Sequence, residues 1–264
     1  MEDSWLHMNK HIVLVHGTGH GAWCWYKLKP LLEAAGHQVT AVELSASGID
    51  PKQIQEVHTF NDYTLPLLEL MESVPADEKV ILVGHSLGGM NIALAMEKYP
   101  HKVSIGVFVS AFVPDTTHAP SYVLEKYLEQ IPAGAWGDTK LFSVGSPGRE
   151  PLAVMSFGPK ALENALYQLC PPEDLVLAKM LVRPGSLFLE DLSMANKFSK
   201  EGFGSVKRVY VINNKDRAIP EEFQRWLVAN MGVIDFKEIK DADHMSMLSR
   251  PQELCKCLLD FNRI

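Results

Sequence analysis

The chain has 264 residues, of which 47% are hydrophobic and 22% charged, and its formal net charge is −7. These values are typical of a globular protein, and at this length one large domain is more common than two. The acidic balance argues against a nucleic-acid partner, because binding to a phosphate backbone needs clustered lysine and arginine.

The four cysteines, Cys24, Cys170, Cys255 and Cys257, do not have the paired spacing of a zinc site, and we expect them to be reduced packing residues. The segment Met1 to Lys10 has mixed charge and no apolar core, so we predict no signal peptide. No run of about 18 apolar residues predicts a membrane span. The expected location is the cytoplasm, with no membrane partner.

The first half of the chain alternates predicted strands and helices. In chain order these are a strand at 11–16, a helix at 28–35, a strand at 38–43, a helix at 65–74 with Pro66 in its first turn, a strand at 79–84, a helix at 87–98 and a strand at 103–110. Continuous β-branched runs separated by helices predict a parallel sheet that is covered on both faces.

Many prolines interrupt the chain from residue 113 to about residue 205, where helical pieces are expected at 121–130 and 160–169 and no clear strand is expected. The strand–helix alternation then returns, with a strand at 206–212, a helix at 221–229, a strand at 235–239 and a helix at 252–259. The predicted organisation is a catalytic core of residues 1–112 and 206–264, with residues 113–205 inserted as a mainly helical cap.

A candidate nucleophile lies in the G-x-S-x-G motif Gly84-His85-Ser86-Leu87-Gly88. The motif alone is weak, but here it follows the strand KVILVG and opens the helix LGGMNIALAMEK. A nucleophile elbow requires this strand–turn–helix setting, in which small neighbours let the serine hydroxyl project above the sheet. The motif therefore predicts Ser86 as nucleophile and an α/β-hydrolase fold, with a mostly parallel, doubly wound sheet.

Two backbone N–H groups are candidates for an oxyanion hole. One belongs to Leu87, the residue after the nucleophile, and the other to Thr18, in the loop His16-Gly17-Thr18 that follows the first strand. Such donors stabilise the developing negative charge on the substrate oxygen. The loop lacks the spacing of a dinucleotide-binding site, so no nucleotide cofactor is expected.

The base is predicted to be His244. A serine hydroxyl needs a neutral imidazole to accept its proton, and the chain order in this fold is serine, acid, histidine. Only His244 of the ten histidines lies beyond the last strand. His85 is too close to Ser86 in the chain to be its base, and we expect it to line the pocket.

The acid is predicted to be Asp216, because it follows the strand at 206–212 in a short loop and so lies on the same side as His244. Its role would be to hold the imidazole tautomer and stabilise the imidazolium. Asp115, which follows the strand at 103–110, is the main rival, and Asp241 is a weaker one. Asp243 adjoins His244 too closely for the usual geometry.

Several stretches together resemble the plant methylesterase family of α/β-hydrolases, over nearly the whole chain. They are HIVLVHGTGHGAWCWYKLKPLLEAAGH, DEKVILVGHSLGGMNIALAMEKYP, GSVKRVYV, IPEEFQRW and ADHMSML. The resemblance implies a dimeric cytosolic enzyme without metal or cofactor, acting on a small-molecule ester. It also places the triad on Ser86, Asp216 and His244, and the oxyanion donors on Thr18 and Leu87.

The resemblance further implies an aromatic substrate pocket made by Phe112, Tyr127 and Trp136, with Met245 beside the base. Each aromatic residue could equally serve ordinary packing within the cap. Such apolar surfaces suit a flat ring or a lipid-like acid.

Other members of the family differ from this chain at positions that carry their chemistry. The hydroxynitrile lyases have Thr or Asn where this chain has Gly17, and the (S)-selective ones have Lys where it has Met245. The methylketone synthases have Ala at the position of Ser86 and Asn at that of Asp216. Because this chain has neither pattern, we expect a methylesterase that releases methanol from a small ester through an acyl-enzyme.

The sequence does not select one physiological ester. Hormone-type esters such as methyl salicylate, methyl jasmonate and methyl indole-acetate are candidates. The segments AKMLVRPGSLF and ELCKCLLD resemble the alkaloid esterases of the family, whose acid product can lose carbon dioxide. A hydroxynitrile lyase and a non-catalytic small-molecule receptor are competing hypotheses for the function.

Overall fold

A computed structural model describes residues 9–132, 134–145 and 150–261. Most of the amino-terminal segment on which the signal-peptide prediction rests lies outside these residues. The central sheet has six parallel strands in the order β2-β1-β3-β4-β7-β8. Its strands are β1 (His11–Val15), β2 (Gln38–Val42), β3 (Val80–Ser86), β4 (Val103–Ala111), β7 (Arg208–Asn213) and β8 (Asp235–Ile239).

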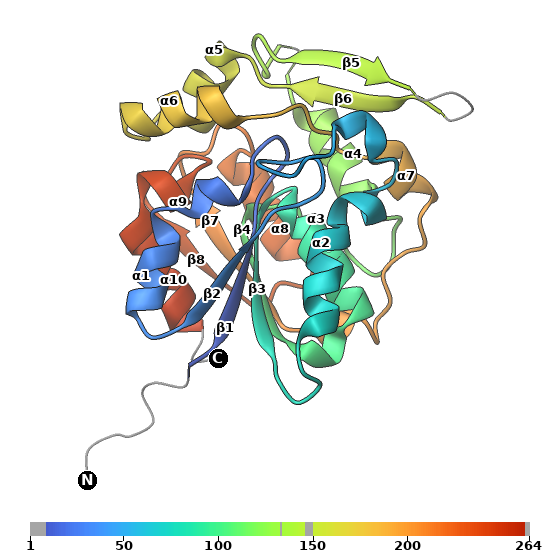
Figure 1. The fold of residues 1–264 in the computed structure, drawn as a ribbon, viewed down its shortest axis with the longest axis vertical. Coiled ribbons are helices and arrows are strands. Elements are labelled where there is room, and N and C mark those ends of the chain that lie inside the picture. Colours follow the sequence, from blue (N-terminus) through green and yellow to red (C-terminus); the bar gives the residue numbers. More distant parts are fainter. Residues whose placement is uncertain (1–8, 133, 146–149, 262–264) are drawn as a thin grey trace.

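Helices cover both faces of this sheet (Figure 1). Successive strand residues point to opposite faces, so Val13 and Val15 join one core cluster while Ile12 and Leu14 join the other. The first cluster includes α2 (Phe60–Ser73), α3 (Gly88–Lys98) and α8 (Glu221–Asn230), and the second includes α1 (Leu28–Ala34) and α10 (Pro251–Phe261). The prediction of a doubly wound parallel sheet is confirmed.

Helix α2 begins earlier than predicted, and Pro66 lies inside it rather than in its first turn. The start is set by Thr59, whose side chain accepts a hydrogen bond from the Asp62 N–H while the Asp62 carboxylate accepts one from the Thr59 N–H. A proline has no N–H to offer the carbonyl four residues earlier, which is that of Asp62. The Ser45 hydroxyl donates to this carbonyl instead, at 2.8 Å.

The inserted segment contains strands as well as helices, so the expectation that it has no strand is wrong. Strands β5 (Lys140–Val144) and β6 (Leu152–Ser156) form an antiparallel hairpin. Leu141 and Phe142 are adjacent and both exposed, so the hairpin lacks the alternating polar pattern by which a strand is recognised. Figure 1 shows the hairpin and the cap helices lying across one end of the sheet.

The remaining elements are short or belong to the cap. They are η1 (Ala22–Trp25), η2 (Ile54–Glu56), η3 (Pro100–Lys102), α4 (Tyr122–Gln130), α5 (Pro159–Ala161), the π-helical η4 (Leu162–Leu166), α6 (Pro172–Leu181), α7 (Leu189–Met194), η5 (Phe203–Ser205) and α9 (Ser246–Ser249). All four cysteines are free thiols. Among the described helices, none is both long and apolar enough to cross a membrane.

Helix α3 packs so closely on the sheet that side chains are excluded at its start. A Cβ atom on Gly88 would lie 2.5 Å from the Val15 carbonyl oxygen and 2.7 Å from that of His16, and one on Gly84 would lie 2.5 Å from the Gly88 carbonyl oxygen. These neighbours are backbone atoms, which cannot rotate away as a side chain would. Glycine is therefore a steric requirement where β3 passes into α3.

We predict that Gly88→Ala lowers the free energy of unfolding by about 1–3 kcal/mol or more, because overpacking forces the strand and the helix apart. Denaturant unfolding followed by circular dichroism measures this change. Gly145→Ala is the matched control, since a Cβ at Gly145 meets nothing within 4 Å. Equal stability of the two variants would contradict the close approach.

Candidate active site

Ser86 is the last residue of β3 and has a φ of 55°, in the left-handed region that residues other than glycine seldom adopt. The pairing of β3 with β4 shifts register between His85 and Ser86, and the Phe112 N–H donates to the Ser86 carbonyl at 3.1 Å. This backbone turn, together with the start of α3 at Gly88, is the strand–turn–helix setting that the motif predicted.

His244 and Asp216 are joined by a 2.7 Å hydrogen bond from His244 Nδ1 to Asp216 Oδ2. Because the carboxylate can only accept, Nδ1 carries the proton and Nε2 is left as an acceptor. Asp216 also accepts from Ser110 Oγ and, through Oδ1, from the N–H groups of Ala218 at 2.7 Å and Ile219 at 2.9 Å. Four donors thus stabilise a buried carboxylate in one orientation.

Ser86 and His244 line one cavity, although the hydrogen bonds of the described residues do not include one between Ser86 Oγ and His244 Nε2. In enzymes without substrate this bond is often long and tightens when the substrate binds. The arrangement can therefore support proton transfer between the two side chains once a carbonyl group occupies the cavity.

The rival acids lie elsewhere. The Asp115 carboxylate pairs with His118 Nδ1 at 2.6 Å and accepts from the N–H of Thr117. Asp241 is exposed at a left-handed position in the loop before His244. Asp243 is fully buried and bonds to other partners. Of the acids weighed from the sequence, only Asp216 is bonded to His244.

The loop after β1 is shaped to leave the Thr18 N–H without a partner among the described residues. It forms a turn closed by the His20 N–H and the Gly17 carbonyl at 3.3 Å, with Gly19 at a φ of 72°. The N–H of Leu87 precedes α3, where helix N–H groups have no partner in the helix. Neither N–H has a hydrogen-bond partner among the described residues, as the predicted oxyanion hole requires, and Thr18 lines the same cavity as Ser86.

Three buried histidines surround this loop and the nucleophile. His16 Nδ1 donates to the Gly17 carbonyl at 2.8 Å while Nε2 accepts from the Leu44 N–H, and His20 bonds to the Thr18 carbonyl and the Tyr167 hydroxyl. Burial lowers the pKa of His16 to about 4 and that of His20 to about 3, and it lowers the pKa of His85 well below its usual range. All three are therefore neutral near pH 7.

The cavity at Ser86, which we call the Ser86 cavity, has a volume of about 110 Å³. Its walls come from both the core and the cap. The lining residues are Thr18, His20, His85, Ser86, Phe112, Tyr127, Leu128, Trp136, Leu141, Met155, Phe157, Leu166, Leu187, Ala218, Ile219 and His244. No lysine, arginine, aspartate or glutamate of the described chain is among them, so the site suits an uncharged, apolar ligand.

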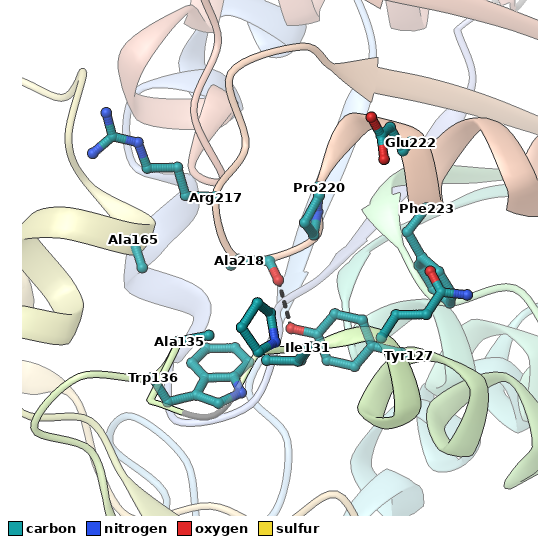
Figure 2. A pocket seen from close by; sticks show the side chains of 12 residues that line it. Tyr127, Ile131, Ala135, Trp136, Ala165, Arg217, Ala218, Pro220, Glu222 and Phe223 are labelled. Carbon is teal, nitrogen blue, oxygen red and sulfur yellow. Dashed lines mark hydrogen bonds between the residues drawn. The ribbon is translucent and has the colours of Figure 1, made fainter.

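A second pocket, of about 140 Å³, lies against the same aromatic wall and shares Tyr127, Trp136 and Ala218 with the Ser86 cavity. Figure 2 shows Tyr127 and Trp136 beside it, with the hydrogen bond from the Tyr127 hydroxyl to the Ala218 carbonyl. Since the Ala218 N–H binds Asp216, this hydrogen bond connects the cap helix α4 to the acid.

Comparisons with known proteins identify the family. Residues 12–256 match the alpha/beta hydrolase family. The chain is 63% identical over 251 residues to salicylic acid-binding protein 2 from Nicotiana tabacum, covering 95% of this chain and 96% of that protein. It is 52% identical over 246 residues to methylesterase 1 from Arabidopsis thaliana, covering 93% of each. The chain belongs to the plant methylesterases of the α/β-hydrolase family.

Polyneuridine aldehyde esterase from Rauvolfia serpentina is 56% identical over 253 residues, which cover 96% of each chain. A crystal structure of polyneuridine aldehyde esterase superposes on this hydrolase with a TM-score of 0.95, at 55% identity, covering 97% of this chain and all of that one. The fold of the hydrolase is therefore that of a structurally characterised esterase.

The structure of the hydrolase places the sequence-predicted pocket residues in two groups. Phe112, Tyr127, Trp136 and His85 line the Ser86 cavity. Met245 does not line it, because its side chain is packed in the core cluster around α1 and α10. Met245 lies at the start of α9, and its N–H donates to the Asp243 carboxylate. The residue after the base thus contributes to packing rather than to the cavity wall.

Other site residues of the hydrolase were missed in the sequence. Ser110 lies one residue before the end of β4, which pairs with β7, the strand that precedes the Asp216 loop. A polar residue near the end of that strand was a usable signal for its bond to Asp216. Phe157 and Leu166 belong to the cap, and no spacing relates them to Ser86. Their place in the wall depends on how the cap folds over the sheet.

We predict that Gly17→Ala reduces kcat/KM about tenfold or more, since small misplacements of a reacting group have large effects on rate. A Cβ at this position would lie 2.7 Å from Ser86 Cβ and 3.2 Å from Ser86 Oγ, so the nucleophile must shift. Steady-state ester hydrolysis measures the effect, and circular dichroism verifies the fold. Wild-type kinetics in the folded variant would contradict a role for this approach.

We also predict that the hydrolase loses stability as the pH falls from about 6.5 to about 4. Unfolding exposes His16, whose pKa then rises from about 4 toward 6.5, so the unfolded state binds more protons in this window. The contribution of His16 to the free energy of unfolding is complete above pH 6.5. Its loss as the pH falls to about 4 is on the order of 3 kcal/mol.

Denaturant unfolding at pH 7, 6 and 5 tests this pH dependence. His16→Gln, which cannot gain a proton, should show a smaller slope of unfolding free energy against pH. His101→Gln removes an exposed histidine and is the control that should keep the wild-type slope. A wild-type slope in His16→Gln would overturn the assignment.

Proposed function

We propose that the hydrolase cleaves a small methyl ester of an apolar acid and releases methanol. The observation that carries the proposal is that Ser86 and His244 face one cavity whose other walls are mainly apolar and uncharged. A hydrophobic acyl group gains by leaving water there, at about 25 cal/mol per Å² of buried apolar surface.

In the proposed mechanism, Ser86 Oγ attacks the ester carbonyl while His244 Nε2 accepts the hydroxyl proton. Asp216, fixed by its donors, stabilises the imidazolium that forms. The N–H groups of Thr18 and Leu87 bind the oxyanion, and each such donor contributes about 3–4 kcal/mol of transition-state stabilisation in a comparable enzyme.

His244 then returns the proton to the leaving methoxide, which departs as methanol and leaves an acyl-enzyme on Ser86. Water attacks this ester, with His244 again as base, and the second tetrahedral intermediate collapses to the free acid. These side chains supply all the proton transfers, so the reaction needs no metal or cofactor and its rate should be unaffected by a chelator.

An alkaloid methyl ester is the second candidate substrate. It is favoured by the likeness to polyneuridine aldehyde esterase over 97% of the chain with a TM-score of 0.95. The site would perform the same ester hydrolysis, and loss of carbon dioxide would follow if the released acid has a carbonyl group at its β position.

Lyase activity is disfavoured by Gly17 and by Met245, which offers no ammonium group to hold cyanide. A receptor role would require tight ligand binding without turnover. The family resemblance further supports a cytoplasmic location and a homodimer. The sedimentation coefficient of the purified protein tests whether it is a dimer.

We predict methanol release from at least one ester of a panel that contains methyl salicylate, methyl jasmonate, methyl indole-acetate and a monoterpene indole alkaloid ester. Ser86→Ala should lower kcat by about 10⁴–10⁶-fold, because the members of a catalytic triad act as a unit. If the wild type binds a panel member tightly but releases no methanol, the receptor function replaces the esterase function.

A further inference from the structure

Asp243 is a fully buried carboxylate next to the base, and the proposed mechanism does not use it. Its Oδ1 accepts from Ser249 Oγ at 2.7 Å and from the Met245 N–H at 3.1 Å. Its Oδ2 accepts from the Leu169 N–H at 2.8 Å and from Cys170 Sγ at 3.4 Å. A buried charge is tolerated only when it is compensated in this way.

The two oxygens of Asp243 face different parts of the molecule. Met245 and Ser249 belong to α9 and its start, so they belong to the core. Leu169 and Cys170 belong to the cap, between η4 and α6. The carboxylate therefore joins the cap to the loop that carries His244.

The cap segment held by Asp243 also forms part of the Ser86 cavity. Leu166 lines the cavity, and the Tyr167 hydroxyl bonds at 2.8 Å to His20, another lining residue. Asp243 contacts Leu169 and Cys170, three and four residues beyond Leu166. The side chain of Asp243, the residue that precedes the base, is thus bonded to the cap segment that forms a wall of the cavity.

The backbone around His244 is held by other buried side chains as well. Asn213 Nδ2 donates to the Asp243 carbonyl at 2.9 Å, and His85 Nε2 donates to the His244 carbonyl at 2.8 Å. These bonds hold the loop toward the sheet and the nucleophile strand. The Asp243 carboxylate holds the same loop toward the cap, where Cys170 Sγ also lies 4.0 Å from the Met245 carbonyl oxygen.

We propose that Asp243 is a positioning residue, which fixes His244 relative to Ser86 and to the cap-side wall of the Ser86 cavity. This inference rests on the proposed function, in which His244 is the base. An amide at position 243 has one acceptor oxygen and one NH₂ group. It must therefore present a donor either to the Leu169 N–H or to the Met245 N–H, and one of the two connections is broken.

The test compares Asp243→Asn with Asp241→Asn. The control removes the same charge two residues away in the same loop, at an exposed position whose positive φ asparagine tolerates well. The substrates are p-nitrophenyl acetate and the best methyl ester of the panel, and Ser86 sites are counted by the endpoint of fluorophosphonate labelling. Asp241→Asn should match the wild type.

For Asp243→Asn we expect kcat per labelled site to fall about 10- to 100-fold with both esters, as for a misplaced base. KM should rise for the bulkier ester, which contacts the Leu166 wall, and stay nearly constant for the acetate. The proton resonance of His244 Nδ1–H should also shift. A residue that only stabilised the fold would lower the number of labelled sites and leave kcat per site unchanged, and that result would overturn the proposal.

If Asp243→Asn does not fold, Ser249→Ala is the second variant, because it removes one donor and retains the charge. An unchanged kcat per site together with an unchanged His244 resonance would then overturn the proposal, and a fall in kcat of about threefold or more would support it. A wild type that hydrolyses no ester would refute the proposed function instead. In that case the His244 resonance alone still tests the positioning.

Discussion

The close approach of α3 to the ends of β1 and β3 is the constraint on which the site depends. The backbone atoms around Gly84 and Gly88 leave no space for a side chain, and Ser86 between them takes a left-handed conformation. Such strain costs about 1–3 kcal/mol and persists only when the surrounding structure enforces it. Here the register shift against β4 and the bond from the Phe112 N–H enforce it. The result is a serine that lines the cavity, next to helix N–H groups that have no partner within the helix.

Around that turn, the protein places ionisable groups in a buried environment and fixes their orientations by hydrogen bonding. Asp216 accepts hydrogen bonds from four donors, one of which is Nδ1 of His244. His16 and His20 stay neutral because burial disfavours the imidazolium and outweighs the hydrogen bonds to the Gly17 and Thr18 carbonyls, which raise the pKa. Low local polarity strengthens each of these interactions, so the positions of the acid and of the oxyanion loop are closely defined.

Hydrogen bonds connect the cap to the catalytic loops, and two of them lead to the acid and to the neighbour of the base. Tyr127 in α4 bonds to Ala218, whose N–H binds Asp216, and Leu169 bonds to Asp243, the neighbour of His244. The side chains that surround the substrate and those that move protons are therefore parts of one hydrogen-bonded network. Changes in the cap can alter the geometry of the base and the acid as well as the shape of the cavity.

The sequence by itself determined the parallel core, the nucleophile turn and the positions of Asp216 and His244 in the series of strands. These features depend on local patterns: apolar runs of strand length, glycines at fixed offsets from Ser86, and polar residues at strand ends that a parallel sheet brings to one edge. Only the tertiary structure decided that α2 continues through Pro66, that β5 pairs with β6, and that Met245 packs away from the cavity. It also decided that Asp243 joins the cap to the base loop. The course of α2 and the contact of Asp243 depend on partners distant in the chain, Ser45 for the Asp62 carbonyl and Leu169 for Asp243, and no local pattern encodes such a contact. Strands β5 and β6 are close in the chain, but the adjacent exposed Leu141 and Phe142 break the alternating pattern by which a strand is recognised.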